Sequence, residues 1–155
     1  MKHKYKEAFM QMAETFGKTS EAKRLQVGAL LVKNNSVISL GVNGQPPGWP
    51  TEVCEDEKYA TLPTVRHAED AALQKLWNST ETANGAEMFV SHAPCLNCSI
   101  KIVTAGVSKV YYRQQYRSDE GLQYLQSKGV EIQQLCKVPF SGFDFLNSVF
   151  NFIKF

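Results

Sequence analysis

Four side chains in two short motifs have the types and spacing needed to bind a metal ion and to move a proton. The first motif is His67-Ala68-Glu69, and the second is Pro94-Cys95-Leu96-Asn97-Cys98. One imidazole and two thiolates would occupy three corners of the tetrahedron that Zn²⁺ prefers, which leaves the fourth corner for water. Because a structural zinc site would need a fourth protein ligand, the pattern favours a catalytic zinc bound by His67, Cys95 and Cys98.

Glu69 follows the histidine by two residues and is placed to accept a proton from the bound water. Two thiolates cancel the formal charge of Zn²⁺ and make the ion a milder Lewis acid, so a neighbouring carboxylate is useful. Simpler interpretations remain open for each residue by itself. His67 could be an ordinary packed histidine and Glu69 a solvated helix residue, while Cys95 and Cys98 could form a redox pair or half of a structural zinc site.

Both motifs lie where a helix is predicted to begin. Residues 67–77 are rich in helix formers, with apolar residues on or near one face. Pro94 precedes the helical pattern of residues 95–106, and Gly106 ends it. A helix N-terminus lowers the pKa of a thiol, so this placement favours the thiolates that zinc requires.

The rest of the chain alternates predicted strands with predicted helices. The first helix ends at Gly17, and its apolar residues at helical spacing are Tyr5, Phe9, Met12, Ala13 and Phe16. Strands are predicted at residues 26–32, 36–42, 86–92, 109–113 and 130–135, and a further helix at residues 118–129. This order predicts a layered α/β domain with a mixed or largely parallel sheet.

Length and composition exclude several classes of protein. The 155 residues fit a single domain spanning residues 1–155, and the 43% hydrophobic and 21% charged content argues against disorder, collagen and a coiled coil. A net charge of +2 gives no electrostatic argument for a nucleic-acid binder. No apolar stretch resembles a membrane span or a signal peptide, so we expect a cytoplasmic protein whose thiols are reduced.

The segment between Asn43 and His67 holds four of the six prolines and is long for a connection in a compact domain. Such loops are usually functional, and the alternative is an exposed Pro-rich insertion without function.

The C-terminal segment is rich in phenylalanine, with six of the nine from Phe140 onward. A helix at about 141–154 would be apolar on two sides, which fits a helix packed on both its own domain and a neighbouring subunit, and fits a simple core helix about equally well. Membrane binding is the weaker interpretation, because Lys154 is the only cation there.

Taken together, His-x-Glu and Pro-Cys-x-x-Cys resemble the signature of zinc deaminases. Three further segments, residues 24–29, 41–48 and 111–117, make the chain similar to the cytidine deaminase superfamily, and within it to deoxycytidylate (dCMP) deaminases, including those of bacteriophages. The Asn-Gly-x-Pro-x-Gly piece beginning at Asn43 is more specific than the zinc motif, which many deaminases share. The resemblance covers about the first 135 residues. It implies a cytidine deaminase-like three-layer α/β/α domain with a central mixed five-stranded sheet.

The resemblance implies zinc-dependent hydrolysis of dCMP to dUMP and ammonia, which would supply dUMP for thymidylate synthesis. Glu69 would take a proton from the zinc-bound water and pass it to N3 of cytosine while C4 is attacked. The backbone around Ala68 would hold the pyrimidine carbonyl, and Asn43 would hydrogen-bond the sugar. Arg24 is the first choice for the 5′-phosphate, because a fork of donors suits phosphate, with a solvated arginine as the alternative.

Other implied contacts concern the nucleotide and its effectors. Tyr116 either packs on the nucleotide or belongs to the core, and Gly44 and Arg117 are candidate effector or phosphate contacts. The resemblance also implies activation by dCTP and inhibition by dTTP, with Mg²⁺ accompanying the effector, and a homo-oligomer, often a hexamer. A viral source would place the enzyme in the host cytoplasm.

The chain departs from these relatives at two positions. Many relatives have an aromatic residue where this chain has Val42, which leaves open the contacts associated with that aromatic, including allosteric ones. Others have a cysteine at the position of Ala22 and bind a second zinc. Cys54 and His92 would lack that partner here, so we expect one zinc ion. His92 would then either line the mouth of the active site or make an ordinary hydrogen bond.

Two alternative functions remain. The first is a deaminase of another base, of the transfer-RNA adenosine or polynucleotide cytidine type. The small net charge argues against it. The insertion from Gly44 to Arg66 also argues against it, because the transfer-RNA enzymes go almost directly from the second strand to His-Ala-Glu. A catalytically inactive, zinc-stabilised binding domain is opposed by Glu69, which such a domain would not need.

Overall fold

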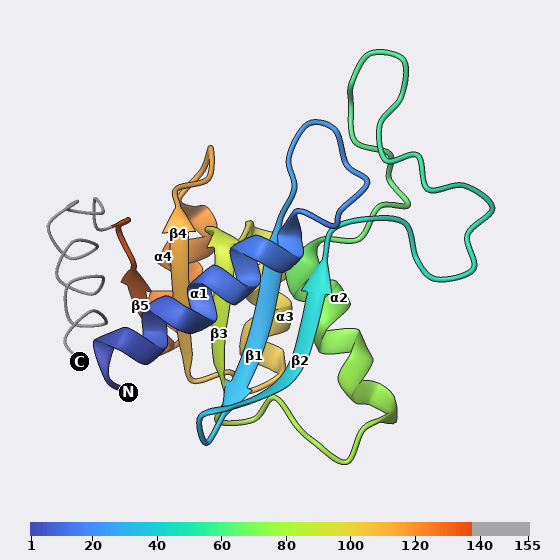
Figure 1. The fold of residues 1–155 in the computed structure, drawn as a ribbon. Coiled ribbons are helices and arrows are strands. Elements are labelled where there is room, and N and C mark those ends of the chain that lie inside the picture. The colour runs from blue at the N-terminus through green and yellow to red at the C-terminus, as the bar shows by residue number, and fades with distance from the viewer. Residues whose placement is uncertain (138–155) are drawn as a thin grey trace, which may run out of the picture.

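The β-branched segments of the chain pair into one mixed sheet in a computed structural model, which describes residues 1–137 (Figure 1). Its strands, β1 to β5, are Gly28–Lys33, Ser36–Val42, Glu87–His92, Lys109–Gln114 and Glu131–Gln134. The spatial order is β2-β1-β3-β4-β5, with β1 antiparallel to both of its neighbours and the pairs β3–β4 and β4–β5 parallel. The predicted mixed five-stranded sheet is therefore confirmed.

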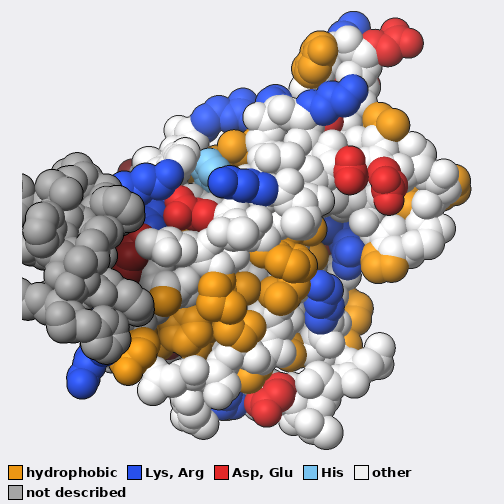
Figure 2. All heavy atoms as spheres, viewed as in Figure 1, with side chains coloured by type: hydrophobic (Ala, Val, Ile, Leu, Met, Phe, Trp, Pro, Cys, Tyr) orange, Lys and Arg blue, Asp and Glu red, His pale blue; other side chains and the backbone are white. Residues whose placement is uncertain are grey.

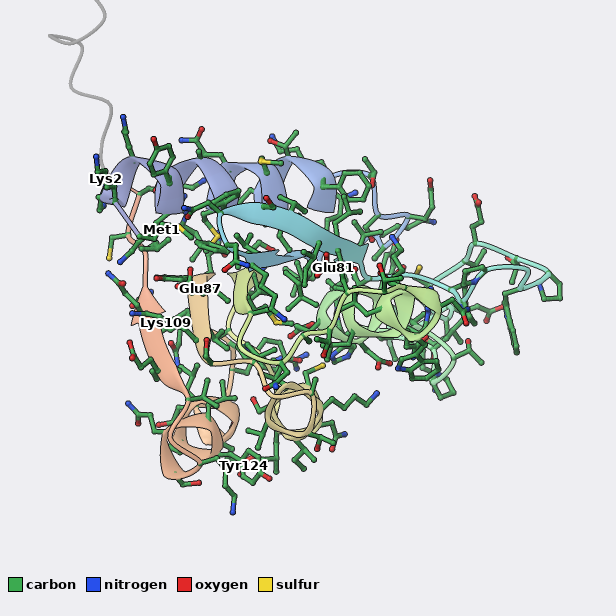
Figure 3. All side chains as sticks on the ribbon, turned by 90° about the horizontal axis from the view of Figure 1, so that it is seen from below. Met1, Lys2, Glu81, Glu87, Lys109 and Tyr124 are labelled. Atoms are coloured by element: carbon green, nitrogen blue, oxygen red, sulfur yellow. The ribbon has the colours of Figure 1, made fainter. Side chains whose placement is uncertain are left out.

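Helices cover both faces of this sheet, as the end-on view in Figure 3 shows. On one face lies α1 (His3–Gly17), and on the other lie α2 (Ala68–Gln74), α3 (Leu96–Thr104) and α4 (Glu120–Ser127). A short 3₁₀ helix, Lys75–Asn78, continues from α2. Because α3 and α4 connect parallel strands, they serve as the crossovers that such pairs require. The predicted three layers are confirmed.

The core has two parts, one on each face of the sheet, because successive side chains of a strand point to opposite faces. The part under α1 contains Met10, Ala13, Leu30, Val32, Phe89, Tyr111 and Leu135. The part under the other three helices includes Leu31, Met88, Val90, Ile102, Val110 and Leu125. Phe89 and Tyr111 stack across β3 and β4 with ring centroids 4.4 Å apart, which joins two neighbouring strands on the α1 side.

The side of α1 that faces the sheet combines Met10 with small residues, and several large apolar residues of the helix stay on its outer side. Ala13 and Gly17 are buried with Met10, whereas Tyr5, Met12 and Phe16 remain between 37% and 47% exposed. Apolar side chains gather along this outer face in Figure 2. The apolar spacing predicted the helix correctly, but close approach of the helix backbone to β1 decides which face is buried.

Some boundaries differ from the predicted ones. The strand predicted from residue 26 begins at Gly28, because the N–H of Val27 donates to the Asn43 side chain instead of joining the sheet. The predicted Phe-rich helix at about 141–154 lies outside the described residues. Among residues 1–137, no helix is long and apolar enough to cross a bilayer.

Candidate functional site

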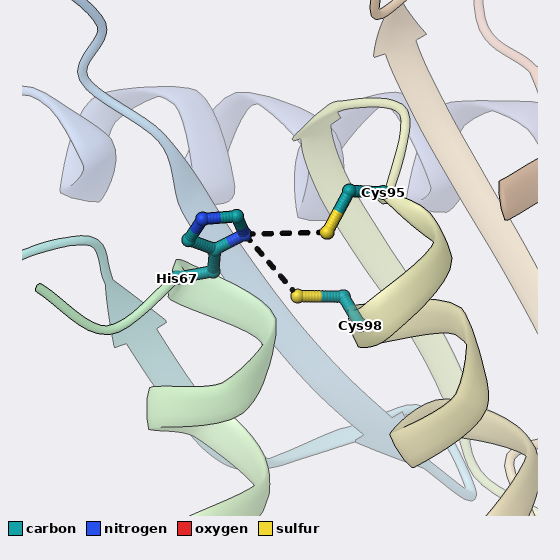
Figure 4. Close-up of side chains that lie close together, drawn as sticks. All are labelled: His67, Cys95 and Cys98. Atoms are coloured by element: carbon teal, nitrogen blue, oxygen red, sulfur yellow. Dashed lines mark hydrogen bonds between the residues drawn. The ribbon is translucent and has the colours of Figure 1, made fainter. Parts of the chain in front are cut away.

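The three predicted metal ligands lie side by side (Figure 4). His67 Nδ1 is 3.5 Å from Cys95 Sγ and 3.4 Å from Cys98 Sγ. A tetrahedral ion with Zn–N bonds of about 2.0–2.1 Å and Zn–S bonds of about 2.3 Å would separate its nitrogen and sulfur ligands by about 3.6 Å. The observed separations match this value, so the donor set fits a zinc ion with one position left for a non-protein ligand.

These side chains meet because each motif opens a helix. His67 is the N-cap residue of α2 and Cys95 is that of α3, both with extended backbone. Cys98 follows Cys95 by nearly one helical turn and therefore lies on the same side of α3. The two helices pack against each other on one face of the sheet, which brings their N-termini together (Figure 1).

The two thiols of this cluster differ strongly in acidity. Hydrogen bonding from the Cys98 thiol, and then from His67, lowers the pKa of Cys95 to about 4 despite its burial. The pKa of Cys98 is raised, because its proton is held by Cys95 and because burial disfavours its thiolate. The hydrogen bond with Cys95 also raises the pKa of His67. The cluster thus holds one thiolate at neutral pH, and a bound cation would displace the proton of Cys98.

Glu69 lies in the first turn of α2, two residues after His67, and is only 4% exposed. Burial raises the pKa of its carboxyl group, although a backbone N–H and the charge of His67 oppose the shift. A raised pKa makes the carboxylate a stronger proton acceptor, and the protonated group can then return the proton. The position therefore suits a group that shuttles protons beside the metal ligands.

A cleft opens above this cluster and encloses about 600 Å³ of space when its open mouth is included. Its wall contains six of the predicted site residues besides Glu69, namely Arg24, Asn43, His67, Ala68, Cys95 and Tyr116. The candidate substrate residues thus come from four separate segments and converge on one space.

Arg24 lies in the segment between α1 and β1, and its side chain is exposed at the wall of the cleft. Asn43, at the end of β2, braces the same segment. Its Oδ1 accepts the N–H of Val27 at 2.8 Å, and its Nδ2 donates to the carbonyl of Leu25 at 2.7 Å. One N–H and one lone pair of this amide remain for a ligand, so Asn43 supports the wall and can also contact a sugar.

Tyr116 combines the two alternatives considered for it, since it lines the cleft and packs against the core under α2 to α4. The guanidinium of Arg117 lies 5.7 Å from the centroid of its ring. Arg117 and Gly44 do not line the cleft. Gly44 exchanges two backbone hydrogen bonds with Arg66 and borders a neighbouring depression that also includes Val42.

His92, at the end of β3, has both of the roles considered for it, at the cleft and in a hydrogen bond. It lines the cleft, and its Nδ1 lies 3.1 Å from the hydroxyl of Ser91. Burial lowers the pKa of its imidazole, which favours the neutral ring at neutral pH. Cys54 is buried in the insertion, where its thiol donates to the carbonyl of Glu52 at 3.3 Å.

The sequence did not single out three residues that the insertion contributes to the cleft. These are Glu55, Thr61 and Val65. The length and proline content of the insertion indicated a functional loop, but no periodic pattern marked which of its side chains would point inward. The interpretation of this segment as an exposed insertion without function is opposed by their position.

Comparison with known proteins places this geometry in a family. The model described as "Cytidine and deoxycytidylate deaminase zinc-binding region" matches residues 3–114. The crystal structure of dCMP deaminase from the cyanophage S-TIM5, in complex with dCMP and dUMP, superposes with a TM-score of 0.85. The two sequences are 47% identical, and the match covers 87% of this chain and 99% of the phage protein.

Two curated proteins extend the comparison. An uncharacterised deaminase of Aliivibrio fischeri, encoded 3′ of luxG, is 38% identical over 112 residues, which is 72% of this chain and 74% of that protein. Deoxycytidylate deaminase of Saccharomyces cerevisiae is 34% identical over 137 residues, which is 81% of this chain. The match covers only 43% of the length of the yeast protein.

Proposed function

The chain belongs to the zinc-binding cytidine and deoxycytidylate deaminase family, and we propose that it hydrolyses dCMP to dUMP and ammonia. The similarity to a phage enzyme crystallised with dCMP and dUMP supports this substrate over other members of the superfamily, because the match spans nearly the whole of that protein. The similarity to named deoxycytidylate deaminases supports it further.

One observation carries the proposal: a single cleft is lined by a buried carboxylate, by two of the predicted metal ligands and by an exposed arginine. Glu69, His67 and Cys95 line the same space as Arg24. A base that reaches Glu69 therefore has a cation available for an attached phosphate. A nucleoside monophosphate has a base at one end and a phosphate at the other, and so it could use both groups.

The chemistry assigned to the chain's own residues is proton transfer and orientation. A zinc ion held by His67, Cys95 and Cys98 would supply Lewis acidity to a water nucleophile. Glu69 accepts a proton from that water and donates it to N3 of cytosine, which makes C4 more electrophilic. After the resulting hydroxide adds to C4, Glu69 takes the remaining proton from the new hydroxyl group and passes it to the amino group, so that the C–N bond breaks, ammonia leaves and the carbonyl of uracil forms.

Recognition of the rest of the nucleotide is proposed for the remaining wall. The backbone at Ala68 would bind the pyrimidine carbonyl, and the unused donor or acceptor of Asn43 would bind the sugar. Arg24 would bind the 5′-phosphate with its planar set of donors. Tyr116 would pack against the nucleotide from the far side of the cleft.

We also propose the regulation that the resemblance implies. In this proposal dCTP activates the enzyme, dTTP inhibits it, Mg²⁺ accompanies the bound triphosphate, and the chain assembles into a homo-oligomer such as a hexamer. Gly44 and Arg117 remain candidate effector contacts outside the cleft. The proposed reaction would use the cytoplasmic nucleotide pool and supply dUMP for thymidylate synthesis.

The deciding experiment follows the ultraviolet absorbance of the zinc-loaded protein with dCMP and, in parallel, with deoxycytidine, each with and without dCTP. Loss of the amino group changes the spectrum of cytosine. We expect rapid conversion of dCMP, slow conversion of deoxycytidine and stimulation by dCTP. Conversion of adenosine or of cytosine in an oligonucleotide, with none of dCMP, would replace the proposed substrate while retaining the deaminase chemistry.

A further inference from the structure

A buried carboxylate from the insertion holds the backbone of the segment that carries Arg24. Glu55 is 8% exposed, and its Oε1 accepts the N–H of Lys23 at 3.0 Å and the N–H of Arg24 at 3.1 Å. Its Oε2 accepts the Lys23 N–H as well, at 3.2 Å. Hydrogen bonds to a charged acceptor are stronger than neutral ones, so this carboxylate fixes two successive peptide groups.

Glu55 is itself held in place by a small hairpin inside the insertion. It pairs with Thr61 across this hairpin, and on either side of it Leu62 donates to Cys54 and Asp56 donates to Ala60, each at 2.9 Å. The Oδ1 atom of Asp56 closes the turn by accepting two further backbone N–H groups. The hydrogen bonds of this hairpin therefore fix the position of the Glu55 carboxylate.

The opposite side of the same segment is held by the end of β2. Asn43 bonds the backbone of Leu25 and Val27, and the hydroxyl of Ser20 donates to the carbonyl of Asn43 at 2.7 Å. The residues before and after Arg24 are thus fixed from two directions. The side chain of Arg24 extends from this braced backbone at the wall of the cleft.

We infer that Glu55 is a positioning residue for phosphate recognition, acting through the backbone of Lys23 and Arg24. The inference rests on the proposed function, in which Arg24 binds the 5′-phosphate of the substrate. Fixing a backbone before the ligand arrives reduces the conformational entropy that is lost on binding. In this inference Glu55 acts on the phosphate through the backbone at Arg24, so its contribution should concern the phosphate and not the reacting base.

Because the three hydrogen bonds involve main-chain donors, replacing the Arg24 side chain leaves them intact, whereas replacing Glu55 weakens them. This separation permits a double-mutant cycle. We therefore compare E55Q, R24A and the double variant for kcat and KM, with dCMP and with deoxycytidine. Glu57→Gln is the matched control, because Glu57 is an exposed acid in the same hairpin and its loss changes the net charge equally.

The E55Q substitution should raise the KM for dCMP about tenfold and change kcat by less than about twofold. The kcat/KM for deoxycytidine should stay at the wild-type value, because this nucleoside has no phosphate. In the R24A background, E55Q should have no further effect on dCMP. An equal loss with both substrates, or the same loss with and without Arg24, would assign Glu55 a merely structural role and overturn the inference.

Calorimetric binding of dUMP and of deoxyuridine gives a readout that does not need turnover. Wild-type protein should bind dUMP more tightly, and E55Q should reduce that preference while leaving the affinity for deoxyuridine unchanged. If dCMP is not deaminated but the preference depends on Glu55, the proposed reaction fails and the positioning role stands. If dCMP is deaminated but E55Q retains the wild-type KM and preference, the positioning role alone fails.

Discussion

The ammonium group of Lys101 lies 2.9 Å from the carboxylate of Asp70, which joins α3 to the first turn of α2. These two helices begin at Cys95 and His67, two of the predicted metal ligands, so the ion pair spans the elements that position the cluster. Lys101 is 52% exposed and Asp70 is 15% exposed, and solvent therefore screens the attraction.

Replacing Lys101 with methionine should lower the affinity for zinc by a few-fold, because an exposed pair contributes less than about 1 kcal/mol. The measurement is competition for zinc against a calibrated chelator. Lys109→Met is the control, since its partner Glu131 belongs to the outer strand β5 at the edge of the sheet. Equal zinc affinities for both variants would show that the Lys101–Asp70 pair does not support the cluster.

Replacing Glu69 with glutamine should leave the zinc content unchanged and reduce kcat with dCMP by at least about 100-fold, because general acid–base catalysis is lost. Cys98→Ala should instead lose the zinc. Metal analysis of the purified variants, together with steady-state rates, separates these outcomes. Cys136→Ser, at an exposed thiol, should retain both zinc and activity. Activity of the Glu69 variant near the wild-type rate would rule out the proton shuttle.

Arg113 on β4 donates to the carboxylate of Glu7 at 2.6 Å and to that of Glu14 at 3.3 Å, tying α1 to the sheet. The guanidinium of Arg113 lowers the pKa of Glu7 below its ordinary value of 4.5, so the folded state favours the carboxylate. The stabilisation is complete above pH 4.5 and is lost as the pH falls below it. Glu7→Gln should reduce the free energy of unfolding at pH 7 by about 1–2 kcal/mol.

Urea unfolding at several pH values tests this, and the difference between wild type and Glu7→Gln should shrink on acidification. The exposed Glu81→Gln variant should match wild type throughout. A difference between wild type and Glu7→Gln that is independent of pH would exclude ionisation of Glu7 as its source.

Gly41 on β2 lies directly against α2, where an added Cβ would collide with the carbonyl oxygen of Ala68 and the N–H of Ala72. Gly41→Ala should therefore destabilise the fold by about 1–3 kcal/mol, because backbone atoms cannot yield as a flexible side chain can. It should also lower zinc occupancy, since α2 begins next to His67. Thermal unfolding with and without zinc measures both effects. An alanine at Gly44, where nothing lies within 4 Å, should be tolerated for stability.

Periodicity and local motifs predicted most of the fold. The order of strands and helices, and the helix starts beside His67 and Cys95, follow from residues close together in sequence, where hydrophobic spacing and capping act. The sequence did not predict which face of α1 is buried, because the close fit of Ala13 and Gly17 against the sheet is a tertiary effect. The contact between Glu55 and Arg24 joins positions 31 residues apart in two irregular segments, and no periodic signal could reveal it.

The pair of backbone hydrogen bonds between Gly44 and Arg66, 3.1 and 2.9 Å long, closes the insertion where it leaves and rejoins the domain. This junction joins the two ends of the insertion, and the bonds from Lys23 and Arg24 to Glu55 attach it to the domain at a second place. Doubling the length of a closed loop costs only about 0.6 kcal/mol. Chain can therefore be added or removed within the insertion at little entropic cost, provided that a carboxylate remains to accept the N–H groups of Lys23 and Arg24.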